Sequence, residues 1–357
     1  MATTPAEDPE PGLPPPKALC EQPRRRRPCV LLSFSAARDR FLRGRFLSAG
    51  LRPFSVRLPS PAGTSTVVHL WAPPRSARRP VLLLHGFGAS ATWQWAPYLR
   101  SLLAAGLDPI VPDLLFFGAS SSTVPDRSDT FQARTVKAAM DGMGVRRFAV
   151  VGVSYGGFVA YRLAAMYPEA VERVVLVSSG VCLEEGDLAA GLFPVADVGE
   201  AAELLVPRRP AEVRRLVKLH LRPAAAHHAL LLPQGLHQCR DPLLIFVMGS
   251  DHLEEKAELL HALINDRKLS DLPKINQPTL IIWGEQDQVF PMELAHRLER
   301  HLGESSRLVV VKKTLGTRQS REVQGVCKSI IDYFRNRVQV IELGGKEVKP
   351  QCDGWKF

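Results

Sequence analysis

The chain has 357 residues, of which 45% are apolar and 23% charged, and its formal net charge is +10. These proportions are typical of a soluble globular protein, and the length allows one large domain with an insertion. No apolar stretch reaches the roughly 18 residues that span a membrane. Because the basic residues are spread along the chain without a nucleic-acid-binding motif, we expect a basic solvated surface and no nucleic-acid partner.

The six cysteines are scattered, without the paired spacing of a zinc site or of a disulfide framework. The histidines show no convincing metal-ligand spacing with cysteines or carboxylates, so we expect no metal site. Scattered cysteines favour a reducing compartment. No apolar stretch with a small-residue cleavage site stands near the start of the chain. We therefore expect a cytoplasmic protein, with a plastid or a membrane surface as alternative locations.

The start of the chain is rich in proline and includes the arginine run 24–27, a composition that buries little apolar surface. We predict that residues 1–33 form a disordered extension. In the next segment, 34–51, apolar residues such as Phe41 and Leu42 recur at helical spacing between arginines. A basic amphipathic helix of this kind either packs against the domain or lies on an anionic membrane surface. We favour packing and keep peripheral membrane contact as the alternative.

Short apolar runs typical of buried parallel strands alternate with helical patterns through the first half of the chain. Strands separated by helices in this way indicate a mostly parallel, doubly wound α/β sheet. The alternation stops near residue 181, resumes with an apolar run at 279–283, and ends with a strand at 307–313 and a helix at 326–334. The earlier expected strands are 66–71, 81–84, 108–112, 148–151 and 174–177, and the expected helices are 93–105, 131–140 and 158–166.

The stretch from 181 to 277 has helical periodicity at 213–221 and 254–263 but no strand pattern. A helical insertion inside an α/β chain is typical of a lid over a site at the edge of the sheet. We therefore predict an α/β core formed by residues 34–180 and 278–337, a helical cap formed by residues 181–277, and a tail at 338–357.

The stretch 152–157, Gly-Val-Ser-Tyr-Gly-Gly, lies between a strand pattern and a helical pattern. A serine between glycines on a strand-to-helix turn is typical of a nucleophile elbow. Gly152 and Gly156 lack a Cβ atom, so the strand and the helix can approach closely around Ser154. The helix that follows directs its first amide, that of Tyr155, toward the place where an oxyanion develops. Ser154 is therefore the candidate nucleophile.

A second glycine-rich segment, His85-Gly86-Phe87-Gly88, directly follows the expected strand 81–84. Gly86 and Gly88 allow backbone amides of this segment to face a ligand. We predict that the amide of Phe87 is the second oxyanion donor, and that His85 is structural and not catalytic.

Acidic residues follow two other strands at the same predicted edge of the sheet. We predict that Asp113 caps a turn, and that the apolar residues 114–117 after it pack near the mouth of a pocket. Asp287 lies just beyond the strand 279–283, at the edge where open α/β sheets keep their sites. A carboxylate there can orient an imidazole and stabilise its protonated form. Asp287 is the candidate acid, and Glu285 is the less favoured substitute.

The three motifs at 85–88, 152–157 and 284–287, in this order, resemble the α/β-hydrolase superfamily. The most similar branches are the monoacylglycerol-lipase-like enzymes and the meta-cleavage (2-hydroxymuconate semialdehyde type) C–C hydrolases, especially a plant subgroup with the run Pro-Asp-Leu-Leu-Phe-Phe-Gly. The resemblance covers about residues 34–334. It implies an α/β-hydrolase fold with a helical cap, and hydrolysis that depends on Ser154. A serine at the elbow is unlike the epoxide hydrolases and haloalkane dehalogenases, whose nucleophile is an aspartate.

In one place the sequence departs from the pattern of that superfamily. The triad order there is Ser, Asp, His, and the histidine lies in the loop after the last strand, commonly as Gly-His. Aligned on Gly316 and Glu322, that position holds Thr317, and no histidine follows His301. A threonine hydroxyl cannot accept a proton near neutral pH, so Ser154 lacks its usual general base.

Three interpretations of this departure stay open. In the first, another histidine such as His296, or His252 of the cap, supplies the base. In the second, the chain is a non-catalytic relative that binds a small ligand in the same pocket. In the third, residues 314–324 come from an altered exon or gene model of an otherwise active enzyme.

From the resemblance we expect a serine hydrolase that acts on an ester or lipid-like carbonyl substrate, with its activity impaired by the missing histidine. Hydrolysis of a C–C bond in a diketone-type substrate is the alternative reaction. Ser154 and Asp287 are the expected catalytic residues, and the amides of Phe87 and Tyr155 form the expected oxyanion hole. The expected partner is a small-molecule substrate. No cofactor is expected, because this chemistry needs only side chains and water.

Overall fold

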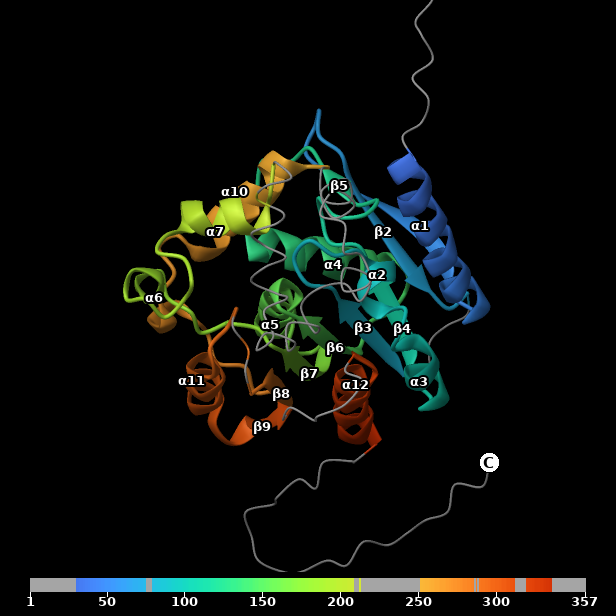
Figure 1. Ribbon diagram of the computed structural model, residues 1–357. Coiled ribbons are helices and arrows are strands. Elements are labelled where there is room, and N and C mark those ends of the chain that lie inside the picture. Colours follow the sequence, from blue (N-terminus) through green and yellow to red (C-terminus); the bar gives the residue numbers. More distant parts are fainter. Residues whose placement is uncertain are drawn as a thin grey trace, which may run out of the picture.

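The computed structural model describes residues 30–74, 79–208, 212, 251–285, 287, 289–311 and 319–335 (Figure 1). Within these ranges, one nine-stranded sheet runs through the molecule in the order β1-β2-β4-β3-β6-β7-β8-β9, with the short β5 paired to β2. The strands are β1 (Arg52–Leu58), β2 (Thr66–Ala72), β3 (Pro80–Leu84), β4 (Asp108–Pro112), β5 (Ser121–Ser122), β6 (Phe148–Val153), β7 (Val171–Val177), β8 (Thr279–Gly284) and β9 (Ser306–Val311).

The strands from β4 to β9 along this order are parallel, whereas β1, β2 and β5 pair antiparallel at the other end of the sheet. The predicted fold class, a mostly parallel α/β sheet with helices, is confirmed. Since parallel strands end at one common edge, the segments after β3, β4, β6, β7 and β8 all meet at the carboxyl edge of the sheet.

Alternate residues of the central strands pack into two separate cores, because side chains of a strand point to opposite faces in turn. In β6, Val150 belongs to one core and Val151 to the other, and Val174 and Val175 of β7 divide in the same way. The first core is covered by α4 (Asp129–Gly142), α5 (Tyr155–Met166) and α11 (Met292–Leu302), and the second by α1 (Val30–Ser48), α2 (Ala91–Trp95), α3 (Leu99–Ala104) and α12 (Gln319–Arg335).

The regular elements described between β7 and β8 are all helices, and two of them, α7 (Val198–Leu205) and α10 (Leu253–Ile264), lie side by side (Figure 1). Ion pairs join this segment to the core: Arg127 Nε lies 2.7 Å from Glu258, and Arg297 lies 2.7 Å from Asp187. The expected helix 213–221 is outside the described residues. The helices are α6 (Gly186–Ala189), α7 (Val198–Leu205), α10 (Leu253–Ile264) and the 3-10 turn Leu269–Asp271; a further 3-10 turn, Gly303–Ser305, precedes β9.

Three expectations differ from the structure. Helix α1 begins at Val30 and ends at Ser48, so the predicted boundary between residues 33 and 34 falls inside it. The expected helix 93–105 is two short helices, because Pro97 between them has no amide to donate and cannot continue the first. Phe41 does not share the inner face of its helix with Leu42: it is 64% exposed, whereas Leu42 is buried.

Candidate active site

Ser154 lies at the sharp turn between β6 and α5, with the backbone angles φ 51° and ψ −119°. A positive φ is rare for a residue with a side chain, and such strain persists only where the surroundings enforce it. Here the Ser154 amide donates to the carbonyl of Val177 over 2.9 Å, and its own carbonyl accepts from the amide of Gly157 and from the hydroxyl of Ser179, both at 2.8 Å. The turn therefore has the geometry of a nucleophile elbow.

The glycines around Ser154 are required by close packing. A Cβ atom on Gly152 would overlap the backbone of Gly156, and one on Gly156 would lie 2.6 Å from the carbonyl oxygens of Leu84 and His85. A Cβ atom on Gly157 would overlap the Ser179 hydroxyl. The elbow is therefore pressed against the end of β3, where the second glycine-rich segment begins.

His85 is buried and holds that segment in place through both ring nitrogens. Nδ1 donates to the carbonyl of Gly86 over 2.8 Å, and Nε2 accepts from the amide of Leu114 over 3.0 Å. Burial lowers the pKa of His85, so the ring stays neutral in this arrangement. These contacts occupy both nitrogens and agree with a structural role. Gly88 has a φ of 73°, a value that glycine adopts without strain, and this conformation allows the chain to turn at the end of the segment.

The backbone amides of Phe87 and Tyr155 come from these two adjoining segments. The Phe87 and Tyr155 rings meet edge to face at 5.7 Å, and a Cβ atom on Gly86 would lie 3.4 Å from that of Ser154. In the described part of the chain, neither amide donates a hydrogen bond to a protein acceptor. Two unpaired backbone donors beside a serine are the arrangement expected of an oxyanion hole.

Asp287 follows β8 at the same edge of the sheet. Its Oδ1 accepts hydrogen bonds from the amides of Val289 and Phe290, each at 3.0 Å. The residue keeps some surface open to solvent, but desolvation by the surrounding protein raises the pKa of the Asp287 carboxyl to about 6, against the lowering effect of the amide bonds. Glu285, the less favoured substitute, is exposed.

The described histidines contact residues other than Ser154, and the ring of His252 meets Phe116 of the turn after β4 edge to face at 5.9 Å. His69 pairs with Asp113, His252 of α10 lies 3.4 Å from Glu255, and His296 of α11 lies 3.8 Å from Glu299. His301 contacts the backbone of Pro273, His261 is exposed, and His85 is bonded as above. Thr317 lies outside the described residues, and the chain has no histidine beyond position 301.

Asp113 holds the turn after β4, as predicted. Its carboxylate accepts from the amides of Ala91 and Ala119, at 2.7 and 3.2 Å, and pairs with His69 at 3.1 Å. The apolar residues after it form a turn and no strand, and they are buried. Among them, Phe117 packs edge to face on Phe87 at 5.2 Å, which places this turn beside the glycine-rich segment 85–88, the candidate oxyanion segment.

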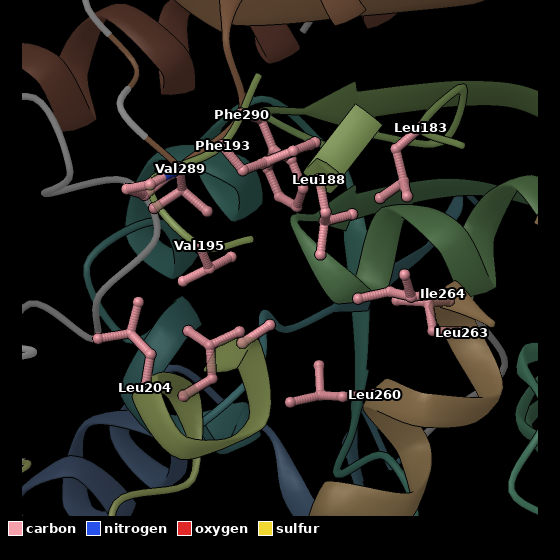
Figure 2. A pocket seen from close by; sticks show the side chains of 13 residues that line it. Leu183, Leu188, Phe193, Val195, Leu204, Leu260, Leu263, Ile264, Val289 and Phe290 are labelled. Carbon is pink, nitrogen blue, oxygen red and sulfur yellow. The ribbon is translucent and has the colours of Figure 1, made fainter. Parts of the chain in front are cut away.

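A cavity of about 130 Å³ lies between the helical segment and the turn after β8 (Figure 2). Thirteen described residues line it, and all of them are apolar. Val289 and Phe290, whose amides bond Asp287, form one wall, and Leu260 of α10 lies on another. Leu260 also belongs to a small apolar cluster against which Phe87 packs. The lining of the cavity therefore connects the turn that holds Asp287 with the apolar cluster beside Phe87.

Lys256 of α10 is a buried cation near the candidate site that the sequence analysis did not identify. Its side chain is 7% exposed, its Nζ donates to the carbonyl of Asp251 over 2.6 Å, and it lies 5.4 Å from the centre of the Phe117 ring. Burial lowers the pKa of this ammonium. The signal was present in the helical spacing, because Lys256 shares a face of α10 with Leu259, Leu260 and Leu263.

In the part of the chain that the structure describes, no group of three histidine, cysteine or acidic side chains could hold a metal ion. Among the described helices, none combines the length and the apolar character needed to cross a bilayer.

A family model described as alpha/beta hydrolase fold matches residues 79–314. The chain therefore belongs to the alpha/beta hydrolase family. A 2-hydroxy-6-oxononadienedioate/2-hydroxy-6-oxononatrienedioate hydrolase of Paraburkholderia xenovorans (strain LB400) is 30% identical over 228 residues, which cover 61% of this chain and 74% of that protein. The Escherichia coli (strain K12) protein of the same name is 29% identical over 237 residues, with the same coverage.

Solved structures share the fold at lower identity. An esterase from Exiguobacterium antarcticum is 20% identical, with a TM-score of 0.59 over 79% of this chain and 100% of that one. A meta-cleavage product hydrolase from Pseudomonas fluorescens IP01 is 21% identical, with a TM-score of 0.56 over 77% of this chain and 95% of that one. The family and its relatives support the hydrolase class of enzyme for this chain.

Proposed function

We propose that the chain is a serine hydrolase that cleaves an ester or lipid-like carbonyl substrate at Ser154. The observation that carries the proposal is the pair of unpaired amides, of Phe87 and Tyr155, beside a serine held at a strained elbow. Backbone donors without a protein partner are costly to bury unless a ligand or solvent uses them. Their position beside a nucleophile matches the charge that develops on a carbonyl oxygen under attack.

The reaction has two halves. Ser154 Oγ adds to the carbonyl carbon, the carbonyl oxygen becomes an oxyanion bonded to the two amides, and the bond to the alcohol oxygen then breaks to leave an acyl-enzyme. The proton of the serine hydroxyl passes by way of a base to the departing alcohol. Water repeats the sequence on the acyl-enzyme and releases the acid and Ser154. Asp287 orients the base where one is present.

The apolar lining of the cavity favours a substrate that carries an apolar substituent. Its lining has no polar side chain among the described residues, and its volume is about 130 Å³. For scale, an apolar cavity of roughly 150 Å³ accommodates benzene. We therefore favour an acyl chain of medium length or a single ring over a long fatty chain at this place. Medium-chain nitrophenyl esters should be cleaved with a higher kcat/KM than the acetyl ester, because each added methylene that enters the cavity leaves water.

A second candidate function is hydrolysis of a C–C bond in a diketone that carries a carboxylate. The observation that favours it is Lys256, a buried cation beside the Phe117 ring and therefore close to the oxyanion segment. The relatives quoted above have dicarboxylates in their names. The Lys256→Met variant separates the two candidates: it should weaken turnover of a carboxylate-bearing diketone and leave a neutral ester unaffected.

The proposal is tested by labelling the full chain with a fluorophosphonate, which reacts with an activated serine beside a working oxyanion hole. We expect labelling of the wild-type chain, none of Ser154→Ala, and unchanged labelling of the control Ser270→Ala, whose serine is exposed in the turn before β8. Absence of labelling in folded wild-type protein would exclude the hydrolase function. A ligand such as hexanoate that raises the melting temperature without turnover would then identify a binding protein.

A further inference from the structure

Helix α1 packs on the domain through one face. Leu42 and Phe46 are buried there, and the Phe46 ring meets Trp71 of β2 at 5.2 Å. The polar side chains on the margin of this face also bond to the domain. The Arg38 guanidinium lies 3.8 Å from the centre of the Trp93 ring, and the Trp93 indole donates to Asp39 over 3.1 Å. The packing role that the sequence favoured therefore describes one face of the helix over residues 38–46.

The opposite face of α1 carries apolar side chains in solvent. Phe41 is 64% exposed and Leu47 44% exposed, and in the described part of the chain these are the large apolar side chains with such exposure. At about 100° per residue they flank the outward direction of the helix, with Arg40 between them. Isolated exposed apolar residues are common, but here both lie on one helix, and neither lines the cavity.

Among the described residues of α1 near these two side chains, the exposed charged residues are arginines, with Asp39 as the exception. Arg40 of α1 is exposed. Arg43 is also exposed, but it lies at the margin of the helix, because its guanidinium is 5.2 Å from the centre of the Trp71 ring. Arg52 of β1 is exposed with its guanidinium bonded to the carbonyls of Leu47 and Leu51. The acid in this part of α1, Asp39, is turned to Trp93. We define the outer face of α1 as Arg40, Phe41, Arg43 and Leu47 together with Arg52. Helix α1 is on the right in Figure 1.

We propose that the outer face of α1 docks on an anionic lipid bilayer. Arginines flanking exposed apolar side chains match an interface where phosphate and carboxylate head groups border the acyl chains. The helix would lie in the plane of the surface, with Phe41 and Leu47 entering the head-group boundary. A second copy of the chain fits this face less well, because a two-fold contact would bring the arginines of both copies together.

The test is sedimentation of the full chain with lipid vesicles. We expect binding to vesicles of equal parts phosphatidylcholine and phosphatidylserine, little binding to phosphatidylcholine alone, and release at high salt. The double variant Phe41→Ser, Leu47→Ser should bind at least about tenfold more weakly. Arg40→Gln should lose roughly fivefold. Arg134→Gln, an exposed arginine on α4, is the matched control and should bind as the wild type does.

Three results would overturn the proposal. The folded wild-type chain fails to bind anionic vesicles. Alternatively, the double variant binds as tightly as the wild type, which would transfer the binding to other basic residues such as the run 24–27. The third result is a wild-type chain that is dimeric and does not bind vesicles, together with a double variant that is monomeric. This result would identify the outer face of α1 as a contact between copies. Melting temperatures of all variants confirm that each is folded.

Discussion

The half of the carboxyl edge formed by β3 and β6 differs from the half formed by β8 and β9 in how closely its backbone is packed. Around Ser154, a single added methyl group on Gly152 or Gly156 would overlap neighbouring backbone. Around Asp287, the same addition on Gly284 would meet its nearest atoms at 4.0 Å, an ordinary contact. The two halves also differ in chemistry, because the chain beyond β9 contains no histidine.

This difference means that the geometry around Ser154 and the chemical reactivity of the site depend on different parts of the chain. The elbow and the oxyanion segment are built into the packing of β3, β6 and α5, so their geometry persists as long as the core does. A general base in the loop after β9 depends on one side chain, and its replacement leaves the sheet intact. A family member can therefore keep its fold and its nucleophile turn while its rate falls by several orders of magnitude.

The largest effect is expected from restoring the base. If Thr317 occupies the position of the triad histidine, Thr317→His should raise kcat/KM for a nitrophenyl ester by about 10²–10⁴-fold, the usual contribution of general base catalysis. The matched control is Thr314→His, which places the same residue in the same segment. Both variants are assayed with and without Ser154→Ala, so that a gain through free imidazole is recognised.

An equal gain in both histidine variants, or no gain in either, would contradict the assignment of position 317. A high wild-type rate would point instead to another base, and His252→Ala and His296→Ala would be compared next. Sequencing the transcript across residues 312–328 distinguishes an altered exon from a genuine substitution: a Gly-His reading there would mean that the active enzyme carries the usual base.

The second prediction compares the two halves of the edge directly. Gly152→Ala should lower the free energy of unfolding by about 3 kcal/mol or more, because backbone must move to admit the Cβ atom. Gly284→Ala, also at the end of a buried strand, should cost less than about 1 kcal/mol. Urea unfolding of both variants measures the difference. Similar losses in the two would show that the packing of the halves is alike.

The third prediction concerns the charge of Asp287. The fold raises the pKa of the Asp287 carboxyl to about 6, so the folded state binds the proton more tightly than the unfolded state does. The protonated carboxyl therefore contributes to stability at low pH, and this contribution is lost as the pH rises through about 6. Asp287→Asn should therefore match the wild type near pH 4 and exceed it by about 2 kcal/mol near pH 8. The difference is smaller than for a fully buried carboxyl, because solvent reaches part of Asp287.

The same variant should lower fluorophosphonate labelling if Asp287 orients a base. Asp271→Asn, at an exposed position in the 3-10 turn before β8, is the control for a change of net charge. Urea unfolding across the pH range provides the readout. A stability difference that is constant with pH would show that the Asp287 carboxyl is not perturbed by the fold.

Much of the fold could be predicted from local pattern. The run 108–112 is a strand with those bounds, and the helix predicted at 254–263 is found at Leu253–Ile264. Apolar runs in parallel strands and the glycines of the elbow are strong signals because burial and close approach leave few alternatives. The turn role of Asp113 was also readable, since an acid directly after a strand meets free amides.

Other features depend on tertiary context that the pattern does not contain. Strand β1 (Arg52–Leu58) was missed, because an edge strand that is mostly exposed and contains Pro53 lacks an apolar run. Phe41 points outward because the opposite face of its helix packs against Trp71 and Trp93. Lys256 could be placed beside Phe117 only once the helical segment was folded over the sheet.

The hydrogen bonds of Asp287 connect acidity to occupancy of the cavity. The amides that bond its Oδ1 belong to Val289 and Phe290, and the side chains of these two residues line the cavity. A ligand that displaces either side chain moves the donors that favour the ionised carboxylate. Such coupling is reciprocal, so protonation of Asp287 changes the affinity for the ligand by the factor by which the ligand changes the proton affinity. With a pKa of about 6, this linkage acts in the pH range just below neutrality.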